Sequence, residues 1–346
     1  MWEPVDQTMD FCHDRSSGEH YENYCRRRKL FPREAGVRMQ TLLLFGLAGF
    51  LAQLVDGSLG MAFGVTATTT LVTVGTAPAV ASAAVHLAEV GTSLASGVSH
   101  WRFRNIDWRT VGILALPGAI GAVLGAYVLT SLSTESASVW ITTILLVLGL
   151  YVLIRFAFLK LGKLITNKRP GAKFLGPLGL VAGFVDASGG GGWGPVATTT
   201  LLSSGRLEPR KVVGSVDTSE FIVALAASVG FFFSLSSEHD LNYTVVAGLM
   251  IGGVLAAPVA AWLVRRMPPR ILGAAAGGLI VFTNARTLLT TSGAGTTLTI
   301  SVLVAIVALW AAGLTAAVRS VRAEKRLNAL VGEDGQTEEP AKLPTS

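Results

Sequence analysis

Residues 179–201 read GLVAGFVDASGGGGWGPVATTTL, and residues 49–71 read GFLAQLVDGSLGMAFGVTATTTL. The two stretches lie 130 residues apart, and twelve of their 23 positions are identical. Apolar segments resemble one another through composition alone, but a shared Asp-x-Ser-x-Gly followed by Ala-Thr-Thr-Thr-Leu is too specific for that explanation. The chain therefore contains an internal repeat.

The match continues beyond these stretches, because Pro209 and Glu220 each lie 131 residues after Pro78 and Glu89. The chain is thus predicted to consist of two halves and flanking segments. We expect a first membrane repeat at 39–165, a second membrane repeat at 173–290, a final membrane helix at 296–318 and a disordered tail at 319–346. The polar residues 1–38 are interpreted as a disordered tail or an over-long start.

Composition places the two repeats in a membrane. Of the 346 residues, 51% are hydrophobic and 14% are charged, whereas soluble domains carry roughly 25% charged residues. Runs such as 111–132 and 139–159 hold almost no charge and reach the length of about 20 residues that a helix needs to cross a bilayer. We predict an all-α, polytopic membrane helix bundle of two sequence repeats with about 8–9 membrane segments, located in the cytoplasmic membrane.

The net charge of +6 does not indicate nucleic-acid binding. Lys and Arg gather between the apolar runs, for example at 160–173 and 265–270, as they do in membrane proteins. We expect a small anion and membrane lipid as partners, without nucleic acid, and a homo-oligomer stays open.

Each repeat has a break in its first long segment. Four consecutive glycines cannot sustain a regular helix, and a broken helix at membrane depth is tolerated only where it is buried in protein or lines a cavity. Free N–H groups at such a break suit an anion, and paired breaks point to a transporter binding site. Close helix packing through small residues is the alternative. The predicted substrate-binding residues surround the two breaks: Asp56, Ser58, Gly60, Asp186, Ser188, Gly189, Gly190, Gly191, Gly192 and Trp193.

Four acidic residues fall inside the predicted membrane segments. Asp56 and Asp186 lie at the breaks, and Glu89 and Glu220 lie at matching positions of a later helix. Ionisable groups in a membrane are expensive and usually functional. We predict that Glu89 and Glu220 couple transport to an ion. For the two aspartates, capping of the broken helix and proton transfer are both open.

The motifs at 49–60 and 179–194 resemble those of the sulfite exporter TauE/SafE family, also called the four-helix-repeat anion permeases. The resemblance covers about residues 40–290, and the first copy departs from it at Leu59, Met61 and Ala62. It implies transport of sulfite, sulfonates or related sulfur-containing anions.

From these features we predict a secondary transporter, working as an exporter, of small sulfur-containing anions such as sulfite or organosulfonates. The alternative is a proton- or sodium-coupled cation transporter that uses the paired intramembrane carboxylates. A membrane scaffold without transport is a third interpretation. The sequence shows no Walker loop, nucleophile elbow or histidine cluster, so we predict no enzyme, no cofactor and no metal site.

Overall fold

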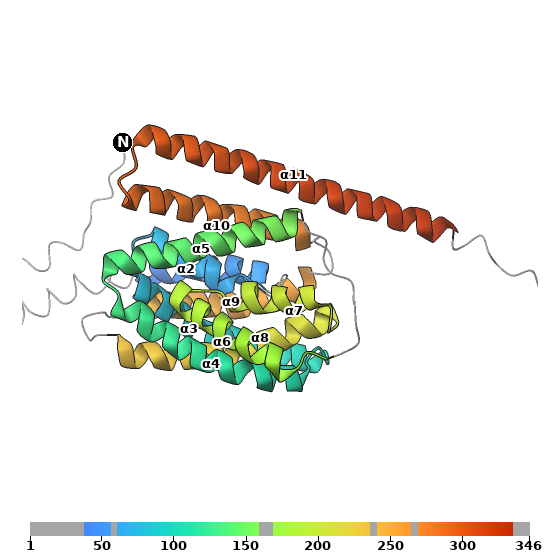
Figure 1. Cartoon of the computed structure of the whole chain (residues 1–346), viewed down its shortest axis with the longest axis horizontal. Helices are drawn as coiled ribbons and strands as arrows, with labels where there is room; N and C mark the ends of the chain where they lie inside the picture. Colours follow the sequence, from blue (N-terminus) through green and yellow to red (C-terminus); the bar gives the residue numbers. More distant parts are fainter. Residues whose placement is uncertain (1–37, 57–60, 159–168, 236–240, 264–268, 335–346) are drawn as a thin grey trace, which may run out of the picture.

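The structure, a computed structural model, describes residues 38–56, 61–158, 169–235, 241–263 and 269–334. Within these ranges every regular element is a helix. Figure 1 shows the helices packed side by side in one bundle, with their axes roughly aligned. The predicted all-α bundle with broken helices is confirmed.

Five helices come from the described part of the first half. They are Arg38–Asp56, α2 (Phe63–Thr73), α3 (Pro78–Arg102), α4 (Trp108–Ser131) and α5 (Thr134–Ala157). Local signals start several of them. Pro78 stands in the first turn of α3, where its missing N–H costs nothing. The side chain of Asp107 accepts a hydrogen bond from the Thr110 N–H at 3.0 Å and so caps α4.

The second half and the C-terminal region supply the other helices. They are α6 (Ala172–Gly189), the π-helical turn η2 (Gly194–Thr198), α7 (Thr199–Ser204), α8 (Pro209–Ser234), α9 (Tyr243–Leu263), α10 (Pro269–Thr291) and α11 (Thr296–Asp334). Two of them end at a left-handed glycine. Gly190 follows α6 with φ 70°, and Gly205 follows α7 with φ 60°, a common way for a helix to stop.

Among the described residues, five helices are long and apolar enough to cross a membrane. They are Arg38–Asp56, α4, α5, α8 over Arg210–Ser234, and α11 over Thr296–Glu324. A shorter apolar helix covers Tyr243–Val259. The 25-residue α3 is not among them, because its buried face is polar. The chain therefore has the spans of a membrane protein, with a polar helix in its interior.

The last helix, α11, lies at the edge of the bundle beside α10 and projects beyond it (Figure 1). Only 11% of its apolar window is buried, so most of that surface is available to lipid. The sequence predicted a membrane helix at 296–318 and a disordered tail from 319, but α11 continues to Asp334. Residues 319–334 are rich in Arg, Ala, Leu and Glu, which are good helix formers, and this explains the difference.

Glycines hold the helices around α6 in close contact. A Cβ atom on Gly121 of α4 would lie 2.1 Å from the Leu180 carbonyl oxygen of α6, and one on Gly183 of α6 would lie 2.1 Å from the Gly118 carbonyl oxygen of α4. Small residues at helix interfaces are how membrane helices approach closely. This packing places the end of α6, and the break that follows it, in the centre of the bundle.

Candidate functional site

In each half, the carboxylate of an aspartate accepts hydrogen bonds from the backbone beyond the break and so caps it. After α6, the Oδ1 atom of Asp186 accepts hydrogen bonds from the N–H groups of Gly192 at 2.7 Å and Trp193 at 2.9 Å. In the first half, the Oδ1 atom of Asp56 accepts from the N–H of Phe63 at 3.3 Å. Phe63 and Trp193 are 130 residues apart, like the two aspartates. The same type of cap thus occurs at matching positions of the two halves.

The second break also touches α2, the helix that follows the first break. The Thr68 hydroxyl of α2 donates a hydrogen bond to the carbonyl oxygen of Gly190. A Cβ atom on Gly191 would lie 2.2 Å from the backbone nitrogen of Val65, and Gly191 has φ 141°. Only glycine combines this close approach with a positive φ. Gly190 and Gly191 therefore allow the second break to pack against α2.

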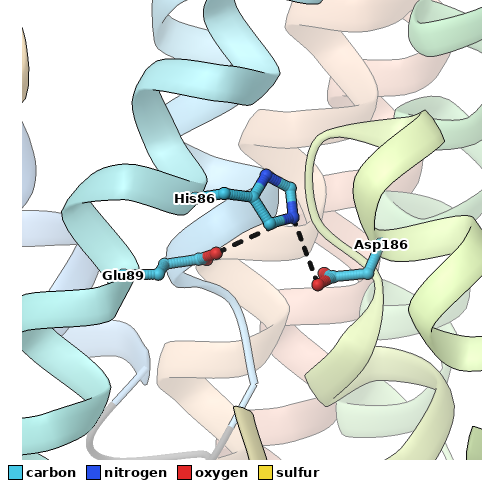
Figure 2. Close-up of side chains that lie close together, drawn as sticks. All are labelled: His86, Glu89 and Asp186. Carbon is cyan, nitrogen blue, oxygen red and sulfur yellow. Dashed lines mark hydrogen bonds and ion pairs between the residues drawn. The ribbon is translucent and has the colours of Figure 1, made fainter. Parts of the chain in front are cut away.

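Three ionisable side chains meet beside the second break. Figure 2 shows His86 and Glu89 on α3 directed toward Asp186 on α6. The Nε2 atom of His86 lies 3.2 Å from Oδ2 of Asp186 and 4.0 Å from Oε2 of Glu89. All three side chains are buried. Among the described residues, this is the group of His, Cys, Asp and Glu whose ligand atoms all lie within 4.8 Å of one another, a spacing at which they can share a cation.

Glu89 has an unusual environment for a carboxylate. Its residue is 1% exposed, yet neither carboxylate oxygen accepts a hydrogen bond from a described residue. Burying an ion in this way is expensive unless a proton or another cation compensates its charge.

Further carboxylates surround this group. Glu220 on α8 is only partly buried, and other carboxylates act on it electrostatically: Asp56, Glu89, Asp186 and Asp217. Asp217 is paired with α3, because it accepts a hydrogen bond from the Ser96 hydroxyl and lies 3.4 Å from Nε2 of His100. The centre of the bundle is therefore strongly acidic.

Comparison with known proteins identifies the family of this chain. Residues 45–287 match the sequence model of the family described as Sulfite exporter TauE/SafE. The chain belongs to this family. It is also similar to the probable membrane transporter protein YtnM of Bacillus subtilis (strain 168), with 52% identity over 273 residues. The match covers 79% of this chain and 91% of that protein. No solved structure matches the chain.

This TauE/SafE chain brings some of its predicted site residues together and uses others for packing. Asp186 and Glu89 meet at His86. In contrast, the Ser188 hydroxyl donates to the Phe184 carbonyl at 2.7 Å within α6. A Cβ atom on Gly189 would meet Ile144. The predicted residues Ser58 and Gly60 lie outside the described residues.

Trp193 takes part in the site through its backbone only. Its ring is fully buried, packs against Gly118 of α4, and its indole N–H donates to the Val216 carbonyl of α8 at 3.0 Å. The side chain therefore anchors the second break to two neighbouring helices, while its backbone N–H binds Asp186.

Sequence reasoning missed two members of the site in this TauE/SafE chain. His86 precedes Glu89 by three residues, so both face the same side of a helix, and this spacing was the available signal. Asp217 lies 131 residues after His86 and thus at the matching position of the second half. Its pairing with His100 joins α3 to α8. The local sequence around Asp217 or around His100 does not reveal this contact.

Proposed function

We propose that this chain is a secondary transporter, working as an exporter, of small sulfur-containing anions such as sulfite or organosulfonates, and that it crosses the cytoplasmic membrane several times. The description of its family as a sulfite exporter supports this substrate class. The printed name of YtnM, a probable membrane transporter, supports transport without naming a substrate.

We propose an anion as the substrate because the second break already binds one negatively charged oxygen, that of the Asp186 carboxylate. Oδ1 of Asp186 accepts from two successive N–H groups, those of Gly192 and Trp193. A sulfite or sulfonate oxygen is the same kind of acceptor, negatively charged and without a proton to donate. The substrate takes over these donors when the Asp186 carboxylate releases them.

The proposed binding site includes both breaks, because Thr68 of α2, the helix that follows the first break, bonds Gly190 of the second. Contact between paired broken segments near the bilayer midplane is typical of transporter sites. The proposed substrate-binding residues are those predicted from the sequence: Asp56, Ser58, Gly60, Asp186, Ser188 and 189–193.

Glu89 and Glu220 are the proposed coupling residues. An anion that enters this acidic centre is repelled by the carboxylates unless positive charge accompanies it. The bare, buried carboxylate of Glu89 and the partly buried Glu220, which feels the charges of other acids, are suited to take up that charge.

The test is anion flux through the full-length protein in proteoliposomes. Labelled sulfite and sulfoacetate are supplied with and without an imposed pH gradient, and vesicles without protein give the baseline. We expect protein-dependent flux that follows the gradient and falls in Asp186→Ala. Absence of flux for both anions, in protein that elutes as a folded species, would overturn the proposed substrate class.

A cation transporter is the second candidate, and the crowding of carboxylates around Glu220 favours it. The double variant Glu89→Gln/Glu220→Gln separates the two functions. A cation carrier would lose cation binding outright. An anion carrier would keep anion exchange at equal pH and lose only its response to the gradient. Sodium binding and sulfite exchange, measured on the same preparation, distinguish these results.

A further inference from the structure

A hydrogen bond of Nδ1 fixes the orientation of the His86 ring. Its Nδ1 lies 2.7 Å from the carbonyl oxygen of Ser82, and a carbonyl only accepts, so Nδ1 carries a hydrogen. The Ser82 hydroxyl, 3.3 Å from the same nitrogen, already donates to the Ala187 carbonyl at 2.7 Å. The other ring nitrogen, Nε2, faces the carboxylates of Asp186 and Glu89.

Nε2 of His86 is turned toward two acceptors. Oδ2 of Asp186 lies at 3.2 Å and Oε2 of Glu89 at 4.0 Å. If Nε2 were bare, its lone pair would face two carboxylate oxygens in a buried site. A proton on Nε2 removes that repulsion, because Nε2 then donates to the carboxylates. The geometry thus creates a place for one exchangeable proton.

The charged groups around this place come from four helices. Glu89 on α3 and Asp186 on α6 act on His86 directly, and Asp56 of the first helix acts on Glu89. From α8, Glu220 interacts with Glu89, while the Phe231 ring that contacts His86 is uncharged. Burial opposes a positive imidazolium, whereas the negative charges of Asp186 and Glu89 favour it.

A line of polar side chains leads from His86 along α3. Ser82, His86, Glu89, Ser93, Ser96 and His100 follow at intervals of four, three, four, three and four residues, which places them on one helix face. We call them the α3 polar stripe. Five are buried, and the side chain of His100 is 23% exposed. From His86 to His100 the stripe extends about 21 Å, more than half of a bilayer core of about 30 Å.

The outer end of the stripe repeats the pairing of its inner end. His100 faces Asp217 of α8 with Nε2 and Oδ2 3.4 Å apart, as His86 faces Asp186 of α6. The Ser96 hydroxyl donates to the same Asp217 carboxylate. One helix thus carries two histidine–aspartate pairs, one central and one close to the surface, with serine hydroxyls between them.

We propose that the site at Nε2 of His86 carries the proton that couples transport, and that the α3 polar stripe connects it to the membrane surface at His100 and Asp217. In the structure the Ser96 hydroxyl donates to Asp217, and the Ser93 hydroxyl donates to the main-chain carbonyl of Glu89. During transfer both hydroxyls turn away from these acceptors. Ser96 takes a proton from the outer pair and passes its own to Ser93, and Ser93 passes its own to the Glu89 carboxylate. Each hydroxyl gains one proton and loses one, and Glu89 delivers the proton to Nε2. The proposal rests on the proposed function for the identity of the anion that moves with the proton.

The protonation state is tested without any substrate, by ¹⁵N NMR of the full-length protein with labelled histidine. The chain has five histidines, and His86→Gln identifies the signal of His86. We expect both ring nitrogens of His86 to be protonated at neutral pH, and only Nδ1 in Asp186→Asn/Glu89→Gln. A neutral His86 ring in the unaltered protein would overturn the proposal. A His86 signal that changes with a chelator would overturn it too, by indicating a metal ion.

The path is tested by comparing two modes of flux in proteoliposomes. Ser96→Ala should lose gradient-driven sulfite flux and keep sulfite–sulfite exchange at equal pH, because exchange needs no net proton movement. Ser99→Ala is the matched control, since Ser99 is exposed and bonds only its own helix at the Ala95 carbonyl. Unchanged gradient-driven flux in Ser96→Ala would refute the path. Absence of sulfite flux in every protein would instead refute the substrate, and the NMR result would still decide the proton site.

Discussion

The carboxylate of Asp186 accepts a hydrogen bond from the backbone N–H of Trp193, seven residues later, at 2.9 Å. Asp56 and Phe63, 130 residues earlier, are joined in the same way at 3.3 Å. Such caps satisfy backbone donors that a break in a helix sets free. Each break is therefore stabilised by a charged oxygen that an anionic substrate could replace.

Replacing Asp186 separates its capping role from its charge. Asp186→Ala leaves the N–H groups of Gly192 and Trp193 without their acceptor in a buried site, which costs about 1–3 kcal/mol per donor. Asp186→Asn keeps an acceptor oxygen and should lose less. Thermal unfolding of the full chain in detergent measures the difference. Equal unfolding temperatures for the two variants would contradict the capping role.

The contact between the second break and α2 depends on Gly191. Gly191→Ala places a Cβ atom 2.2 Å from the Val65 nitrogen at φ 141°, and the backbone strain alone costs about 1–2 kcal/mol. We expect lower thermal stability and loss of sulfite flux. The control is Gly176→Ala in α6, where nothing lies within 4 Å of the new atom. If Gly191→Ala behaved like this control, the close contact between the second break and α2 would not be required for stability or flux.

Thr68 tests the same contact through a hydrogen bond. Thr68→Val removes the hydroxyl that donates to Gly190 and leaves that carbonyl buried, at a cost of about 1–3 kcal/mol. Thr70→Val is the matched change in α2, since its hydroxyl bonds the Thr66 carbonyl of the same helix. We expect only Thr68→Val to reduce flux and unfolding temperature. Similar effects of both changes would point to a general loss of helix stability.

Packing around α6 is tested on two glycines of α4. Gly121→Ala places an atom 2.1 Å from the Leu180 carbonyl oxygen, whereas Gly112→Ala meets nothing within 4 Å. Gly121→Ala should force α4 and α6 apart and destabilise the protein by about 1–3 kcal/mol. Gly112→Ala should leave stability unchanged or raise it slightly. Thermal unfolding of both variants gives the comparison, and a tolerated Gly121→Ala would mean that the two helices are less tightly packed.

Much of the fold could be predicted from the sequence, because its strongest signals are local. Four glycines at 189–192 must interrupt a helix, and the matching motif at 56–60 identifies a second interruption. Hydropathy alone indicated the membrane. The boundary of the final helix was missed, since loss of apolar character at 319 ends a membrane segment without ending a helix.

The chemistry of the site was harder to predict, because it depends on contacts between distant residues. The sequence left capping and proton transfer open for Asp186. The structure shows that its Oδ1 caps the break while Oδ2 faces His86, so one carboxylate has a contact for each role. His86 of α3 meets Asp186 of α6, and His100 of α3 meets Asp217 of α8, and no local pattern reveals which helices lie together in this way.

The most direct test of the anion site is the affinity of the full-length protein for sulfite, measured by titration calorimetry on the unaltered chain and on Asp186→Asn. If sulfite competes with the Asp186 carboxylate for the N–H groups of Gly192 and Trp193, removing that negative charge should tighten binding by about tenfold, or about 1.4 kcal/mol. Binding to the unaltered protein that becomes tighter in Asp186→Asn is the predicted result. Absence of sulfite binding in the unaltered protein, or its loss in a folded Asp186→Asn, would contradict an anion site at the breaks.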